Sequence, residues 1–282
     1  MNKRNLISAL SLLLAFGLSQ NAGAQNFPPM GGMPGMPGQG APAAQARPAG
    51  APQAGPQAGP QARPQGGFGM RQPVKFDKTD ITPYFTPSTK KAATPDKEGF
   101  IRRWTLLEPI EKPNGSNTVF TDSYLRTEFG KNYFTNQMTI IPKDGDIATV
   151  EGKELKWHAL DSKLYNVKLF RFATSLADGA TRYGILCWGV TVINCEEDIE
   201  NVRLAVGSNS ASMWWVNGEE AVILSGDRRM VADDGTSKRL TLKKGKNVVR
   251  CVVINGPGMS DFCARFIDEN GQPVLNYTIT NE

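Results

Sequence analysis

The stretch SMWWVNGEEAVI, residues 212–223, places two adjacent tryptophans directly before an Asn-Gly pair. An Asn-Gly pair between two apolar runs predicts a two-residue β-hairpin of type I′, because both central residues of that turn need positive φ. In the strand before the turn, neighbouring side chains point to opposite faces, so Trp214 and Trp215 cannot enter one core. Either one tryptophan has another role or a second layer covers it.

Short β-rich runs continue on both sides of this hairpin, separated by glycine, asparagine or aspartate, and helical signals are scarce. Many closely spaced strands without alternating helices are typical of an antiparallel sandwich or barrel. We therefore expect an all-β fold, an antiparallel β-sandwich. Its strands are expected within residues 163–172, 182–193, 201–207, 211–216, 220–224, 238–242, 246–254, 261–268 and 273–279. The pair Lys244-Gly245 is expected to close a further hairpin.

Alternation along two of these strands assigns faces to two of the four cysteines. Cys251 lies on the aliphatic face of its strand, whereas Cys263 lies opposite the phenylalanines of its own strand. We expect these two strands to pair, and the opposed faces disfavour a disulfide between them. Together with Cys187 and Cys195, they are expected to form one disulfide or to be small buried thiols, rather than catalytic groups.

The first quarter of the 282-residue chain has a different composition from the rest. Residues 1–24 combine a basic start, a short apolar run and the ending Ala-Gly-Ala, which is the pattern of a signal peptide. Residues 25–75 consist almost entirely of Pro, Gly, Ala, Gln and Met, which predicts a disordered tether. We expect one folded domain in 76–282 and an exported protein, periplasmic or extracellular, with no transmembrane segment after signal cleavage.

The positive charge of the chain is concentrated in that first quarter. Six of the 32 lysines and arginines fall within residues 1–75, and none of the 27 acidic residues does. Residues 76–282 are therefore close to neutral. A nucleic-acid partner needs a basic patch on the folded part, so the composition argues against one.

The second half of the chain resembles the galactose-binding-like β-sandwich modules of secreted bacterial proteins that process polysaccharides. The resemblance rests on VRLAVGSNSASMWWVNGEEAV, GDRRMVADD, LTLKKGKNVVRCVVINGPG and DFCARFIDENGQPV, and it extends over about residues 99–275. The pattern's own residues correspond to Gly207, Ser208, Trp215, Asn217, Gly218, Leu242, Gly245, Asn247, Phe262, Arg265, Asp268 and Gly271.

This resemblance implies a jelly-roll sandwich and a carbohydrate ligand, because such modules accompany acetylxylan esterases and glycoside hydrolases. The chain departs from the pattern at Glu108-Pro109-Ile110, where Gly-Pro-Phe is usual, and at Asn209-Ser210, where an acidic pair is usual. These departures argue against a ligand or ion contact of the family near 207–212. No catalytic domain of such an esterase or hydrolase is visible in the sequence.

The sequence gives little support for catalysis. The single histidine, His158, lacks a nucleophilic serine on a sharp turn, and no pair of carboxylates can be placed together. The sequence leaves the question of an enzyme open and favours a protein without catalytic residues. No metal ligands are assigned and no cofactor is expected. Asp233-Asp234-Gly235 is read as a β-turn rather than a calcium loop, which leaves room for a structural calcium ion elsewhere.

Sugar binding by a sandwich uses an aromatic platform beside planar polar side chains. Ligand-binding candidates are therefore Trp214, Trp215, Asp227, Arg228 and Arg229. The family pattern makes Trp215 the structural residue and Trp214 the ligand surface, provided no second sheet covers it.

The interpretation is an exported non-catalytic module that binds polysaccharide or oligosaccharide. The alternatives are an envelope adaptor that binds another protein, and a cryptic hydrolase. An exposed aromatic beside Arg and Asp in a shallow groove would favour the module, and a broad apolar patch would favour the adaptor. Two facing buried carboxylates in a deep cleft would favour the hydrolase.

Overall fold

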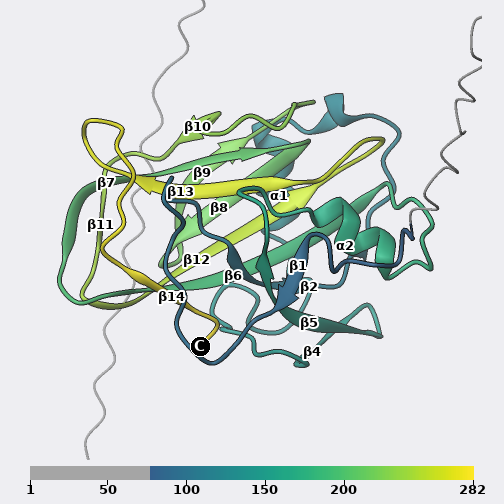
Figure 1. Ribbon diagram of the computed structural model, residues 1–282. Helices are drawn as coiled ribbons and strands as arrows, with labels where there is room; N and C mark the ends of the chain where they lie inside the picture. The colour runs from purple at the N-terminus through teal and green to yellow at the C-terminus, as the bar shows by residue number, and fades with distance from the viewer. Residues whose placement is uncertain (1–76) are drawn as a thin grey trace, which may run out of the picture. The chain divides into compact units, whose positions relative to one another are not determined.

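The computed structural model describes residues 77–282, and the signal peptide and tether expected before them lie outside the described residues. Two antiparallel sheets pack against each other (Figure 1). The larger one has ten strands. Seven of them follow one another in the order β1 (Phe85–Pro87), β5 (Lys153–Ser162), β2 (Arg103–Leu107), β6 (Ile185–Cys195), β12 (Gly245–Ile254), β8 (Ala211–Val216) and β9 (Glu219–Leu224). In addition, β3 (Ile110–Glu111) and β14 (Thr278–Thr280) pair with β6, and β4 (Ile147–Val150) pairs with β5. The smaller one joins β10 (Gly235–Thr236), β7 (Ile199–Ser208), β11 (Leu240–Leu242) and β13 (Phe262–Ile267). The expected antiparallel sandwich is confirmed.

The larger sheet is covered on both of its faces. One face packs on the smaller sheet and forms the inter-sheet core, which contains Trp104, Trp214 and Phe262. The other face forms a second core with Trp157, Trp188, Trp215 and residues of the segment after β3. Every residue of β8 is consequently buried. This explains why its sequence is apolar on both sides of the pleat, as in strands buried between two layers.

The layer over the second core is built around a helix that the strand pattern did not indicate. After the short 3₁₀ helix η1 (Asn117–Val119), helix α1 spans Asp122–Phe129. Thr121 caps it by accepting a hydrogen bond from the Tyr124 amide at 3.2 Å. Leu125 and Phe129 lie four residues apart, so both face the sheet and both are fully buried.

The Asn217-Gly218 turn forms as predicted. Its two central residues have φ of 52° and 87°, the positive values that a type I′ hairpin needs. The Asn217 side chain also accepts a hydrogen bond from the Val248 amide at 2.8 Å and donates one to Asn247 Oδ1 at 2.9 Å. The hairpin is thereby fixed to β12, and the register of β8 against β12 places Trp214 opposite Cys251.

The structure corrects four details of the predicted strands. Residues 163–172 contain no strand and lead into helix α2 (Leu169–Ser175), because Leu169, Phe172 and Ala173 follow a helical spacing that buries one side. The Lys244-Gly245 turn closes no hairpin, since β11 belongs to the smaller sheet and β12 to the larger one. Strands β12 and β13 do not pair, for the same reason. Within 273–279, strand structure begins only at Thr278.

All four cysteines are buried free thiols. Cys251 faces the inter-sheet core as expected, and Cys187 faces it from the neighbouring strand β6. Cys263 lies outside the inter-sheet core, where its buried thiol contacts the backbone of Gly207 and Asp233. Burial raises the pKa of the Cys263 thiol to about 12, which leaves it neutral and unreactive at physiological pH.

Candidate functional site

Both adjacent tryptophans are structural. Trp214 is 0% exposed and packs edge-on against Trp104 and Phe262, while its indole N–H donates to Ser212 Oγ at 2.9 Å. Trp215 is 7% exposed and stacks on Trp188 in the second core, with ring centroids 6.0 Å apart. The expected ligand surface at Trp214 is therefore wrong, because the smaller sheet covers that residue. Trp215 faces the other side of the larger sheet, and the layer that forms the second core covers it. A second layer was one of the two alternatives that the sequence left open.

The three polar candidates after β9 have different surroundings and do not form one site. Arg228 donates to Asp234 Oδ2 from Nε at 2.8 Å and from Nη2 at 2.5 Å. Asp227 accepts a hydrogen bond from Asn117 Nδ2 at 2.8 Å, which ties the loop to the segment before α1. Arg229 is exposed and lines no hollow described below. Of the five sequence candidates, only Arg228 therefore takes part in a groove.

That groove follows strand β9, the open edge of the larger sheet. Two hollows of about 630 Å³ and 540 Å³ share Glu220, Ala221 and Lys238, so they form one continuous depression, the β9 groove. One side is the whole of β9, and the other is the segment from Asp234 to Thr241 that carries β10 and β11. Among residues 77–282, β9 pairs only with β8, and its outer backbone edge faces the groove.

The polar side chains of the β9 groove are held by ion pairs. Arg126 of α1 forms a two-pronged contact with Glu220, with Nη2 at 2.7 Å from Oε1 and Nε at 3.1 Å from Oε2. Arg228 and Asp234 form the corresponding pair at the other end. The remaining charged groups are Asp122, Glu219, Lys238, Arg239 and Lys243, and the apolar floor includes Val216, Val222 and Leu240.

Sequence reasoning missed most of this groove. Arg126 could not be placed because residues 120–129 gave no helix prediction. Lys238 and Arg239 lie in the connection between β10 and β11, two strands of the sheet opposite to β9. Glu220 carried a usable signal, since the Asn217-Gly218 turn places it near the start of an edge strand. The contact between Arg126 and Glu220, which are 94 positions apart, depends on tertiary structure alone.

Two carboxylates are deeply buried, but each has its own cationic partner. Glu128 contacts the ammonium groups of Lys112 and Lys131 and the hydroxyl of Tyr133. Burial opposes its ionisation, yet these three hydrogen bonds prevail and lower the pKa of Glu128 to about 2. Asp261 binds Lys168 at 2.9 Å, and its burial raises its pKa. Each buried carboxylate is thus neutralised by lysines of its own segment of the fold.

His158 and the Asp233-Asp234 pair also have local partners. His158 Nε2 lies 3.0 Å from Glu108 Oε1, and no serine within residues 77–282 is bonded to the ring. Asp233 pairs with Arg265 and Asp234 with Arg228, so the two adjacent carboxylates serve different arginines. Among residues 77–282, no three His, Cys, Asp or Glu side chains gather in a way that could hold a metal ion.

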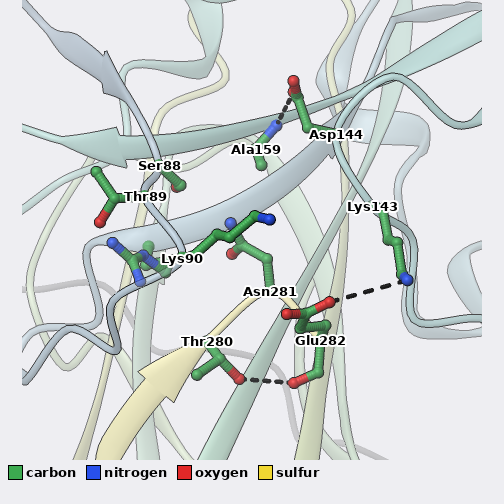
Figure 2. Close-up of a pocket in the computed structure, with 10 residues that line it drawn as sticks. Ser88, Thr89, Lys90, Lys143, Asp144, Ala159, Thr280, Asn281 and Glu282 are labelled. Atoms are coloured by element: carbon green, nitrogen blue, oxygen red, sulfur yellow. Dashed lines mark hydrogen bonds and ion pairs between the residues drawn. The ribbon is translucent and has the colours of Figure 1, made fainter.

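A further hollow of about 310 Å³ lies at the opposite edge of the larger sheet (Figure 2). Its walls come from residues 88–90 after β1, from Lys143 and Asp144 before β4, and from residues 280–282 at the end of β14. Arg103 lies at its floor, almost fully buried, and binds both oxygens of Asp161 at 2.7 Å.

No family model and no curated protein matches the chain. Two of the solved structures to which it is similar are described as PA14 domains. One is described as a PA14 sugar-binding domain from an RTX adhesin, with a TM-score of 0.34, 12% identity, and coverage of 63% of this chain and 96% of that one. The other is the PA14 domain of the MpAFP antifreeze protein, with a TM-score of 0.33, 9% identity, and coverage of 68% and 91%. Likeness at this level decides neither the fold nor the ligand of this chain.

The described part of the chain, residues 77–282, has no helix with the length and apolar character needed to cross a membrane.

Proposed function

We propose that this chain is the non-catalytic, carbohydrate-binding module of an exported protein, and that a glycan chain lies in the β9 groove. The observation that carries the proposal is the continuity of the groove along β9, with planar charged side chains above an aliphatic floor. Sugar recognition needs both, because hydroxyl groups take hydrogen bonds while the carbon face of the ring prefers apolar contact.

The ion pairs suit this role because they position donors and acceptors before a ligand arrives. Arg126 and Glu220 are 50% and 38% exposed at the side chain, so their outer N–H groups and carboxylate lone pairs remain open to solvent. A group already held in place loses little rotamer freedom on binding. Water bridges would complete contacts that the side chains do not reach directly.

An aromatic platform does not contribute to this groove. None of the five tryptophans lines it, and all five are buried. The affinity must therefore come from hydrogen bonds and from the aliphatic floor. We expect binding that depends on several consecutive sugar units rather than on a single stacked ring.

The β9 edge also supports a second candidate, an adaptor that binds an extended peptide. A sheet edge with free backbone groups can accept an added strand, and the hollow beside Arg228 is lined by every residue from 220 to 225. The charges on both sides of the groove favour a hydroxyl-rich glycan over an apolar strand. We therefore rank the adaptor second.

Affinity electrophoresis of the full chain in gels containing soluble polysaccharides tests the proposal. We expect at least one polysaccharide to retard the chain, and we expect Arg126→Ala and Glu220→Ala to weaken that retardation by about tenfold, the scale of one hydrogen bond to a charged group. Both side chains are half exposed, so the melting temperature should change little.

Lys97→Ala is the matched control, because its side chain is 90% exposed and lines no part of the groove. It should migrate like the parent chain. If no polysaccharide in a panel of xylans, mannans, β-glucans and α-glucans retards the chain, the carbohydrate proposal fails. If retardation occurs but both groove variants keep it, the β9 groove is not the site.

A further inference from the structure

The hollow in Figure 2 continues into a larger one. An adjoining space of about 650 Å³ shares Lys143, Thr280 and Glu282 with it and adds Lys246 of β12 and Thr278 of β14. We call the combined space the β14 hollow. It shares no lining residue with the β9 groove, so its chemistry can be judged independently.

The β14 hollow contains cationic groups that lack close acidic partners. Lys90 and Lys246 form no ion pair within residues 77–282. In the same part of the chain, the Lys143 ammonium group approaches only the Glu282 carboxylate, at the long distance of 3.9 Å. Arg103, by contrast, already donates hydrogen bonds to both oxygens of Asp161 and to the Lys91 carbonyl, the last at 2.6 Å. Its guanidinium group is therefore held by these partners and is not available to a ligand. The positive charge open to a ligand is that of the three lysines. The acidic side chains of the hollow are Glu282 and Asp144, and Asp144 Oδ1 accepts a hydrogen bond from the Ala159 amide at 2.8 Å.

The hollow also has an unused hydrogen-bond acceptor. Asn281 lines it, and its side-chain oxygen is buried without a partner among the described residues. Such a group is costly unless a donor reaches it. A ligand that satisfies both features must carry an anionic group for the lysines and a hydroxyl donor for Asn281.

Glu282 shows which anion the hollow accommodates. Its carboxylate points into the space and pairs with Lys143, as the dashed line in Figure 2 shows. The Glu282 side chain is 66% exposed and the Lys143 side chain 69% exposed, so this contact is weak and readily exchanged for another carboxylate. The hollow thus holds a carboxylate of the chain itself in the position that a ligand carboxylate would take.

We propose that the β14 hollow is a second binding site that takes the carboxylate of an acidic sugar unit, a uronate, in place of the Glu282 side chain. Lys90 and Lys143 bind the carboxylate, Lys246 adds long-range attraction, and a ring hydroxyl donates to Asn281. This site does not rest on the proposed function of the β9 groove, because a free uronate oligomer could bind here even if no neutral glycan binds there.

Isothermal titration of the full chain with tri-galacturonate at low salt tests this site. We expect Lys90→Gln and Lys143→Gln each to weaken binding by about fivefold, the scale of an exposed charge contact. Glu282→Gln should strengthen it, because the competing carboxylate is gone. Added salt should weaken binding, since exposed charges are screened.

Lys153→Gln is the matched control, an exposed lysine outside the hollow, and it should bind like the parent chain. Equal losses in Lys153→Gln and Lys90→Gln would overturn the proposal, because the attraction would then be non-specific. A sulfated trisaccharide that binds as tightly as tri-galacturonate would overturn the assignment to a carboxylate. Loss of tri-galacturonate binding in Arg126→Ala, with Lys90→Gln unaffected, would move the uronate to the β9 groove.

Discussion

Replacing Glu128 by glutamine should destabilise the fold in a pH-dependent way. The carboxylate is 6% exposed at the side chain and is contacted by two ammonium groups and a tyrosine hydroxyl, which lower its pKa to about 2 from an ordinary value of 4.5. Each unit of difference between folded and unfolded chains is worth about 1.4 kcal/mol, so the ionised form contributes up to about 3 kcal/mol. Since Lys131 is half exposed, solvent screening reduces this to about 2 kcal/mol.

The sign follows from the lowered pKa. Above pH 4.5 the carboxylate is ionised in both states and its full stabilisation is present, and this stabilisation is lost as the pH falls toward about 2. The variant, which cannot ionise, should therefore be about 2 kcal/mol less stable than the parent at pH 7. The difference should shrink through pH 4 and nearly vanish at pH 2.

Urea denaturation followed by tryptophan emission measures this difference, because Trp157 and Trp188 lie in the core that the Glu128 segment covers. Glu111→Gln is the control, since Glu111 is 63% exposed in its contacts with Lys153 and Arg182, and it should change stability by less than about 0.5 kcal/mol. A stability difference for Glu128→Gln that is absent at pH 7, or constant from pH 7 to pH 2, would refute the reasoning.

Three further outcomes are expected. Trp214→Ala and Trp215→Ala should each lower the free energy of unfolding, measured by urea denaturation, by about 3–5 kcal/mol, since both leave cavities. A variant that lost glycan binding at full stability would contradict the structural role. Gly207→Ala should lower the free energy of unfolding by about 1–3 kcal/mol and weaken retardation by polysaccharide. The reason is that its Cβ would lie 1.8 Å from the Val231 carbonyl oxygen and displace the loop that carries Arg228. An unchanged melting temperature and unchanged binding would count against this. Glycan binding should leave tryptophan emission unchanged in a fluorescence titration, since all five indoles are buried away from both sites, and a shift would place an indole at the ligand.

The strand pattern predicted much of the fold because period-two alternation and turn chemistry are local properties. The Asn217-Gly218 hairpin, strand 211–216 and the inward face of Cys251 are all confirmed. Pairing between distant strands is not local, and there the predictions failed. The sequence around Lys244-Gly245 resembles a hairpin turn, yet the chain crosses there from one sheet to the other.

The helix α1 escaped prediction although its signals are present. Thr121 is a good N-cap, and Leu125 and Phe129 have helical spacing. The run is only eight residues long, which is short for an amphipathic pattern to stand out. Missing it had consequences, because α1 covers Trp215 and supplies Arg126 to the β9 groove. The incomplete prediction of the site traces partly to this segment, whereas the wrong expectation for Trp214 has another cause, the smaller sheet that covers it.

The covering of both faces of the larger sheet limits where this domain can bind anything. An aromatic side chain in the middle of β6, β8 or β12 must enter one core or the other, so paired tryptophans in such a strand indicate two layers rather than a binding platform. Ligands can reach only edges and ends. The β9 groove lies along a strand with one unpaired side, and the β14 hollow lies where β1 and β14 end. Both are rich in charged groups that neither core could accept unpaired. Recognition by polar side chains at sheet edges is thus a consequence of the fold itself.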